Sequence, residues 1–298
     1  MYRTFKEIEQ AVLKRGSLKK LALAASADDV TLESVVRAVR GGIVEAQLIG
    51  DAAATKKILK KLGENPKDYY ITDEADPVKA VRLACERVKN GEADMPMKGL
   101  MQSQDYLRAI LDKSFGFMPE KGMLTEATTF EYDGRLITAT DCAVVIAPDY
   151  DEKVKIIKNA VQFQKALGYE CPKVAAITPV EIVNPKIPST IDAAMLAVAN
   201  RRGQIKDCIV DGPLALDNAI SKESSKHKGI VSDVAGCADI LLLPDLDAGN
   251  LMLKAIIYMM NTVSSSNIIG TNVPVVMTSR SDTPENKYNS ILTAVIRA

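Results

Sequence analysis

The sequence predicts an α/β protein in which helices cover a largely parallel sheet. Three observations predict this class. Short apolar runs typical of buried strands alternate with longer segments of helical periodicity, as in chains that build parallel sheets. Glycine, proline and Asp/Asn-containing turns separate the two kinds of segment. The chain has 298 residues, 47% of them hydrophobic, which is enough for a large core in one or two domains.

Strands and helices alternate regularly through the first hundred residues. Apolar runs predict strands at residues 20–25, 45–49 and 69–72. Helical periodicity predicts helices at residues 1–14, 31–40, 54–62 and 76–90. A weaker strand signal at 93–99 contains Pro96 and precedes a predicted helix at 104–111.

A hairpin interrupts this alternation. Asp133-Gly134 separates two strand-like runs, 128–132 and 135–138, and this dipeptide is a strong signal for a two-residue turn. We therefore place the first crossing between domains near residue 136. Alternation then resumes, with predicted strands at 138–146, 173–177, 208–210, 240–243 and 273–277. The helices predicted between and after them are 152–167, 191–200, 216–221, 251–260 and one that begins at residue 284.

Composition excludes several classes of function. Lys and Arg together number 38, as do Asp and Glu, so neither nucleic acid nor an anionic membrane is expected as the main partner. The five cysteines are scattered and form no CxxC pair, and His227 is the single histidine. We therefore expect reduced thiols in a cytoplasmic protein, without a metal site or a histidine-based triad. No apolar run is long enough to span a bilayer.

Polar side chains follow three of the predicted strands. Ser279, Arg280 and Asp282 lie between the strand at 273–277 and the last helix, where free N–H groups and the helix dipole favour anions. An ordinary capped helix start with a surface ion pair explains these residues equally well. Lys98, at another strand end, either meets an anion or is simply solvated. The loop at 244–250 is either a turn with a helix cap or a polar ligand site.

Several segments together resemble the phosphate acetyl/butyryltransferase family, and most closely its butyryl-type branch. VDGPLALDNA, PDLDAGN and TSRSD are specific individually. The segments, in family order, are Lys98-Gly99-Leu100, Asp141-Cys142-Ala143, VEIVNPKIPST at 180–190, RGQI at 202–205, VDGPLALDNA at 210–219, PDLDAGN at 244–250 and PVVMTSRSD at 274–282.

The resemblance implies a fold similar to that of the isocitrate and isopropylmalate dehydrogenases. Such a protein has two three-layer α/β domains with a cleft between them, and it dimerises through the second domain. The C-terminal strand and helix would return to the first domain. The expected domains are therefore residues 1–136 with 271–298, and residues 137–270.

The resemblance also implies a reversible reaction in which an acyl group, butyryl by preference, moves between coenzyme A and inorganic phosphate through a ternary complex. Ser279 and Arg280 match the family's Ser-Arg pair, which assigns Ser279 to the developing oxyanion and Arg280 to phosphate. Acetyl-type members carry an aspartate seven residues after this serine, where this chain has Asn286. Asp282, three residues after the serine as in the butyryl-type pattern, is the first choice for the general base, and Glu285 is the second.

Further residues are expected to bind substrate. Lys98 and Arg108 are candidates for phosphate, and Asp245, Asn250 and Cys142 are candidates in the second domain, although Cys142 equally suits a small buried strand residue. The residues 124–126, Leu-Thr-Glu, depart from a Ser-His pair of the butyryl-type pattern. The expected ligands are an acyl-CoA, phosphate and an acyl phosphate, with no metal or other cofactor. The expected assembly is a homodimer or higher homo-oligomer.

Two other functions suit the same residues. One is a metal- and NAD(P)-dependent hydroxyacid dehydrogenase of the same fold, for which Asp245 and Asp247 are the only close acidic pair we identify. The other is a non-catalytic, CoA-binding member of the family, consistent with Asn286 and the missing histidine.

Overall fold

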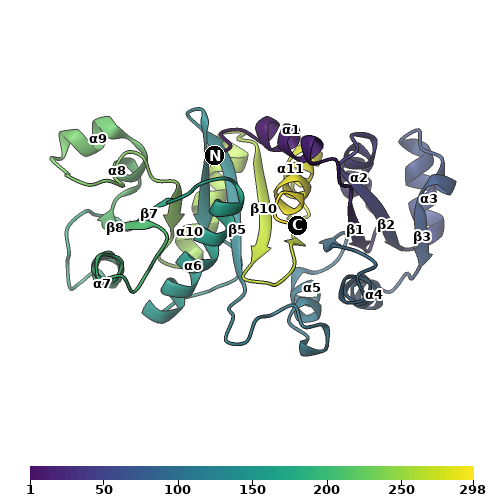
Figure 1. The fold of residues 1–298 in the computed structure, drawn as a ribbon, viewed down its shortest axis with the longest axis horizontal. Helices are drawn as coiled ribbons and strands as arrows, with labels where there is room; N and C mark the ends of the chain where they lie inside the picture. Colours follow the sequence, from purple (N-terminus) through teal and green to yellow (C-terminus); the bar gives the residue numbers. More distant parts are fainter. The chain divides into compact units, whose positions relative to one another are not determined.

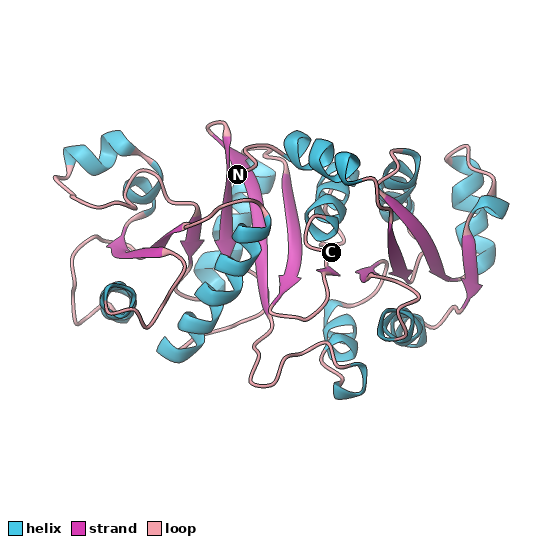
Figure 2. Ribbon diagram, in the orientation of Figure 1, coloured by secondary structure: helices cyan, strands magenta, loops and turns pink.

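The computed structural model describes residues 1–298 and divides into two compact units. The first unit comprises Phe5–Gly122 and Val263–Ala298, and the second comprises Met1–Thr4 and Met123–Thr262. Each unit contains mixed β-structure with helices packed against it (Figures 1 and 2). The predicted α/β class is confirmed.

The strands of the first unit are parallel except for the last. Their order in space is β3 (Tyr70–Asp73), β2 (Val44–Gly50), β1 (Lys19–Ala24), β4 (Met95–Lys98), β11 (Val275–Val276) and β10 (Ser264–Ile269). Only β10 runs antiparallel to its neighbour β11. The weak strand signal around Pro96 is thus confirmed by β4, which is buried along its whole length.

Helices connect these strands and cover both faces of the sheet. They are α1 (Phe5–Arg15), α2 (Asp29–Arg40), α3 (Ala52–Lys61), α4 (Pro77–Lys89), α5 (Ser103–Ile110) and α11 (Pro284–Val295), with short 3-10 turns η1 (Pro66–Asp68) and η2 (Lys113–Phe115). Asp28, Asp51 and Asp76 cap α2, α3 and α4 by accepting N–H bonds of the first turn. Helix α11 packs against β10, α2 and α1, whereas α4 packs against β1 and α5 (Figure 1).

The second unit begins with the predicted hairpin. Its strands follow the order β5 (Thr125–Tyr132), β6 (Arg135–Thr140), β9 (Ile240–Leu242), β7 (Lys173–Ile177) and β8 (Ile209–Leu214). Strands β5 and β6 are antiparallel, and the pairs that follow are parallel. Asp133 and Gly134 both have positive φ angles, 48° and 67°, as a type I′ turn requires.

The helices of the second unit enclose a core that includes Ile137, Ala175 and Leu241. They are α6 (Tyr150–Ala166), α7 (Pro188–Arg201), α8 (Leu216–Ile220), α9 (Lys222–His227) and α10 (Leu246–Lys254), which continues into a π-helical turn η3 (Ala255–Met259). The sequence predicts only a polar connector for the residues of α9. It predicts a helix that begins at residue 251, whereas α10 begins at Leu246. Asp245 caps α10 through the N–H of Ala248, at 2.9 Å, so the helix includes most of the loop residues 244–250.

The chain passes between the units at residues 4/5, 122/123 and 262/263, whereas the sequence predicts the latter two crossings at 136/137 and 270/271. Both differences have a structural reason. Strands β5 and β6 pair with each other, so the whole hairpin belongs to the second unit. Strand β10 pairs with β11 and packs on α11, so it belongs to the first.

Candidate active site

The candidate site of the first unit lies at the carboxyl ends of β1, β4 and β11, which are adjacent and parallel. Strands β1, β2 and β3 follow one another outward, and the chain then returns to place β4 on the other side of β1. This reversal is a topological switch point, where open α/β sheets bind ligands. The ends of β1 and β4 lie close together, because a Cβ added at Gly99 would come within 2.3 Å of the Ala25 carbonyl oxygen. Only glycine fits there.

The loop after β11 brings Ser279 and Asp282 together. The Asp282 carboxylate accepts a hydrogen bond from the Ser279 N–H at 2.7 Å, and the Asp282 N–H donates back to the Ser279 carbonyl at 3.2 Å. The Ser279 hydroxyl lies 3.0 Å from that of Ser281. Arg280 is exposed at the turn of this loop. Helix α11 has its own cap, Thr283, which accepts from the Asn286 N–H, so Asp282 is not the helix cap.

Two lysine side chains that are only 2% exposed converge on the same loop. The Lys98 ammonium donates to the Thr278 carbonyl at 3.3 Å. The Lys287 ammonium donates to the Ser279 carbonyl at 2.8 Å and to the Thr278 hydroxyl at 3.1 Å. Burial, together with the nearby charges of Lys287 and Arg280, lowers the pKa of Lys98 to about 8. Burial also lowers the pKa of Lys287.

Lys287 is not among the site residues predicted from the sequence. A signal was present, because Lys287 stands four residues before Ile291 and beside Tyr288, on the apolar stripe of the predicted helix. A lysine on an apolar stripe becomes buried when the helix packs, and buried cations have partners. The structure places that partner in the Ser279 loop.

We expect the binding of an anion at this loop to weaken above about pH 8. The pKa of Lys98 is lowered in the folded protein, so the unfolded chain binds more protons between about 8 and the ordinary lysine value. The folded state therefore gains stability from this group as pH rises through that window, but the ammonium that attracts an anion is lost. The affinity for inorganic phosphate, used as a probe anion and measured between about pH 7 and 9, should fall in the wild-type protein and stay flat in Lys98→Met. A flat profile in the wild type would remove Lys98 from anion binding.

The second choice for a base, Glu285, is turned toward helix α2. Its carboxylate forms an ion pair with Arg37, whose guanidinium also lies 3.9 Å from the centre of the Tyr288 ring. Glu285 and Arg37 line a cavity of about 520 Å³ together with Arg40. Asn286 is buried, and its side-chain oxygen accepts the Ser264 N–H at 3.0 Å. Asn286 thus joins α11 to β10 and has a structural role.

Arg108 lies in the last turn of α5. Its guanidinium is paired with Asp105 at 3.0 Å, and its side chain is 69% exposed. The same helix is joined to β11 by the Tyr106 hydroxyl, which donates to the Val276 carbonyl at 3.1 Å. The structure therefore anchors the helix that carries Arg108 but shows no contact between Arg108 and the Ser279 loop.

The candidate residues of the second unit gather at the carboxyl ends of β6 and β9. The buried Asp141 carboxylate accepts the N–H groups of Ala143, Val144 and Glu126 at 2.7–2.8 Å. The Asn250 amide donates to the Cys142 carbonyl at 3.1 Å. Helix α10 approaches so closely that a Cβ at Gly249 would lie 2.5 Å from the Asp141 carbonyl oxygen.

Within this group, Cys142 and Asp245 have evident structural roles. Cys142 is fully buried in the core of the second unit, and burial raises the pKa of its thiol well above the ordinary value. A buried neutral thiol behaves as a small apolar side chain. The Asp245 carboxylate is engaged in capping α10. Asn250 is half-buried, and its amide ties the two loops together.

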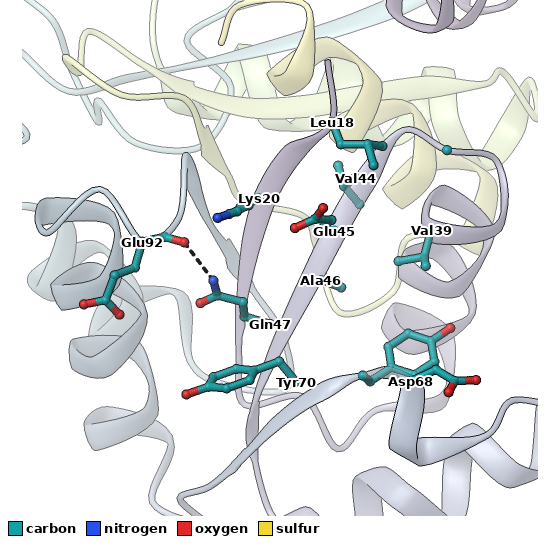
Figure 3. A pocket seen from close by; sticks show the side chains of 12 residues that line it. Leu18, Lys20, Val39, Val44, Glu45, Ala46, Gln47, Asp68, Tyr70 and Glu92 are labelled. Carbon is teal, nitrogen blue, oxygen red and sulfur yellow. Dashed lines mark hydrogen bonds between the residues drawn. The ribbon is translucent and has the colours of Figure 1, made fainter. Parts of the chain in front are cut away.

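A different cavity of the first unit lies at the opposite ends of the strands. It has a volume of about 480 Å³ and is lined by residues at the starts of β1, β2 and β3, among them Lys20, Glu45 and Tyr70 (Figure 3). The Gln47 side chain, which also lines it, donates to the Glu92 carbonyl at 2.8 Å. Because ligands of open α/β sheets bind at carboxyl ends, we do not place the candidate site in this cavity.

No group of three or more His, Cys, Asp or Glu side chains is placed to hold a metal ion. No helix of the chain has both the length and the apolar character that crossing a membrane requires.

The fold and the site define an α/β protein that places a serine, a carboxylate and several cations at the carboxyl ends of its parallel strands. The family model described as phosphate acetyl/butaryl transferase matches residues 71–295. The chain is 43% identical over 300 residues to the phosphate butyryltransferase of Clostridium acetobutylicum, covering 100% of this chain and 99% of the relative. It is 42% identical over 287 residues to the phosphate acetyltransferase of Thermotoga maritima, covering 96% and 97%. The chain belongs to the phosphate acetyl/butyryltransferase family.

Solved structures show the same fold. A branched-chain phosphotransacylase from Enterococcus faecalis superposes with a TM-score of 0.83 at 28% identity, covering 94% of this chain and 99% of that one. A putative 4-hydroxythreonine-4-phosphate dehydrogenase from Salmonella typhimurium superposes with a TM-score of 0.60 at 14% identity, covering 95% and 100%. The second likeness concerns the fold alone.

Proposed function

We propose that this protein is a phosphate acyltransferase that moves a short acyl group, butyryl by preference, reversibly between coenzyme A and inorganic phosphate. The observation that carries the proposal is the loop after β11, where Ser279, Arg280 and Asp282 are held beside two buried lysines in a chain of this family. The reverse reaction is a direct test: butyryl phosphate and coenzyme A should give a thioester, with loss of the free thiol. A protein that binds both without forming the thioester would contradict the proposal.

The proposed chemistry needs both substrates bound at once. A phosphate oxygen attacks the thioester carbonyl, the carbon–oxygen bond forms, and the carbon–sulfur bond breaks to release a thiolate. Ser279 donates its hydroxyl hydrogen bond to the developing oxyanion. In this direction Asp282 takes the proton of the attacking hydrogen phosphate and passes it to the departing thiolate. In the reverse direction it removes the proton from the thiol of coenzyme A and returns it to the departing phosphate. Coenzyme A thioester and phosphate are substrates, and the mechanism uses no further cofactor.

Cations hold the phosphate in this proposal. Arg280 offers a fixed fork of donors on an exposed loop, and Lys98 offers an ammonium that has one weak protein hydrogen bond, at 3.3 Å. Arg108 is a further candidate, because its helix is anchored to β11 by Tyr106. In the second unit, Asn250 and Asp245 remain candidates for contacts to coenzyme A, and Cys142 would act through its carbonyl, which accepts the Asn250 amide at 3.1 Å.

Arg280→Ala is expected to raise the apparent KM for phosphate by about 10-fold or more while changing the KM for acyl-CoA much less. The reason is that a charge-assisted contact to the phosphate dianion disappears, which corresponds to about 1.5–3 kcal/mol. Initial rates over a grid of both substrate concentrations provide the measurement. Equal changes in the two KM values would contradict a phosphate-specific role.

The finer description of the fold is also part of this proposal. We infer that the chain has the two-domain architecture of the isocitrate and isopropylmalate dehydrogenases, with the expected domains 1–136 plus 271–298 and 137–270 adjusted so that the β5–β6 hairpin joins the second and β10 joins the first. The two compact units and the likeness of fold to a dehydrogenase of phosphorylated hydroxythreonine support this inference.

We further infer that the protein is a homodimer that pairs through its second unit. Helix α7 exposes Ile191, Met195 and Val198, which are 37%, 46% and 46% exposed and recur at helical spacing. An unpartnered apolar stripe of this kind suits a second copy of the same surface. Sedimentation velocity should show a dimer for the wild type and a shift to monomer for Met195→Asp. A wild-type monomer at micromolar concentration would contradict the inference.

A further inference from the structure

Two buried ammonium groups reach one short loop from different elements. Lys98 is the last residue of β4, and Lys287 lies in the first turn and a half of α11. Both side chains are 2% exposed. Taking an ammonium out of water is unfavourable unless it is paired, and both pKa values are lowered accordingly. An apolar side chain at residue 287 would avoid that penalty. The buried ammonium is therefore better explained by a function than by stability.

The contacts of Lys287 indicate what it does. Its ammonium binds the Ser279 carbonyl at 2.8 Å, while the Asp282 carboxylate binds the Ser279 N–H at 2.7 Å. The backbone of Ser279 is therefore held on its donor side by an anion and on its acceptor side by a cation. The second Lys287 bond, to the Thr278 hydroxyl at 3.1 Å, fixes the residue before it. No rotation of this short segment is possible without breaking a charge-assisted hydrogen bond.

We propose that Lys287 is a positioning residue, whose ammonium holds the Ser279 backbone in the orientation that aims the Ser279 hydroxyl at the reacting carbonyl. It acts through the loop and does not touch substrate. The inference rests on the proposed acyl transfer, because it assigns a role to Ser279 in that reaction. Misplacing a reacting group by about 1 Å lowers rates by as much as about 100-fold.

Lys287→Met tests the proposal against a purely structural role. Turnover should fall about 10- to 100-fold, with the KM values for acyl-CoA and phosphate changed by less than about 3-fold. In a Ser279→Ala background the same substitution should have little further effect, because its target has gone. Lys153→Met is the matched control. Lys153 is a lysine 6% exposed that pairs with Asp192 in the second unit, so its loss should lower stability to urea and leave turnover intact.

A second readout does not depend on activity. Backbone hydrogen exchange of residues 278–282 should be faster in Lys287→Met than in the wild type and unchanged in Lys153→Met. An unchanged exchange rate, or an effect of Lys287→Met that is equally large with and without the Ser279 hydroxyl, would overturn the positioning role. If the wild-type protein shows no acyl transfer at all, the proposed function is wrong, and the exchange rates still decide whether Lys287 orders the loop.

Discussion

Asp282→Asn is expected to lower turnover by about 10²- to 10⁴-fold, the usual range for loss of a general base. Asparagine keeps an oxygen that can accept the Ser279 N–H, which the Asp282 carboxylate binds at 2.7 Å, so the loop should keep its shape. What disappears is the ability to take a proton from the thiol. The pH profile of the rate should therefore differ between the wild type and the variant.

Two further variants separate basicity from structure. Asp282→Ala removes both the base and the acceptor of the Ser279 N–H, so it should lower stability as well as turnover. Glu285→Gln should keep most of the activity, because Glu285 is paired with Arg37 on the α2 side of the helix. If Glu285→Gln instead lowers the rate and alters its pH profile while Asp282→Asn does neither, Glu285 is the base and our assignment is wrong.

Ser279→Ala is expected to lower turnover by about 10²- to 10³-fold, as removal of one oxyanion donor does in other acyl-transfer enzymes. The KM values should change little, because this hydrogen bond strengthens only as charge develops on the carbonyl oxygen. The backbone contacts of Ser279 to Asp282 and Lys287 do not involve its side chain, so the loop should persist.

Ser281→Ala provides the comparison for that experiment. Ser281 is exposed, and its hydroxyl lies 3.0 Å from that of Ser279, so its loss removes a neighbouring hydroxyl from the same loop. We expect the rate to fall by no more than a few-fold. Comparable losses in Ser279→Ala and Ser281→Ala would show that a general disturbance of the loop, and not one hydroxyl, lowers the rate.

Much of this fold can be predicted from short segments, because its turns and the periodicity of its strands and helices depend on residues that are close in sequence. The Asp133-Gly134 turn requires two positive φ angles, and few residue pairs adopt them. The order of strands and helices follows from periodicity, and the polar residues after β4, β9 and β11 lie where parallel strands end. These signals are sufficient to locate the loop of Ser279 and the loop of Asp245 from the amino-acid sequence alone.

Strand β10 was missed because its sequence, SSSNII, lacks the apolar alternation of a strand. Several of its polar groups instead pair with α11: the Asn267 amide donates to the Thr293 hydroxyl at 2.6 Å, and Asn286 accepts the Ser264 N–H. A polar contact between a strand and a helix depends on both partners, and neither segment alone predicts it. The boundary between the two units at residues 262/263 depends on the same packing of β10 on α11.

The directions of side chains could not be predicted from the sequence either. Glu285, Asn286 and Lys287 are consecutive, yet they face α2, β10 and the Ser279 loop respectively. Helical geometry separates neighbours by about 100°, so adjacent residues meet different surroundings. Residue type indicated that a carboxylate and cations were available, and only the packing of α11 shows which of them reach the loop.

Release of free thiol from butyryl-CoA, with and without inorganic phosphate, tests the central claim most directly. We expect release that requires phosphate and is matched by an equal amount of butyryl phosphate, with slower release from other short acyl-CoAs. Absence of release from every acyl-CoA between acetyl and isovaleryl, release that does not depend on phosphate, or reduction of NAD(P) with magnesium and a hydroxyacid would contradict it.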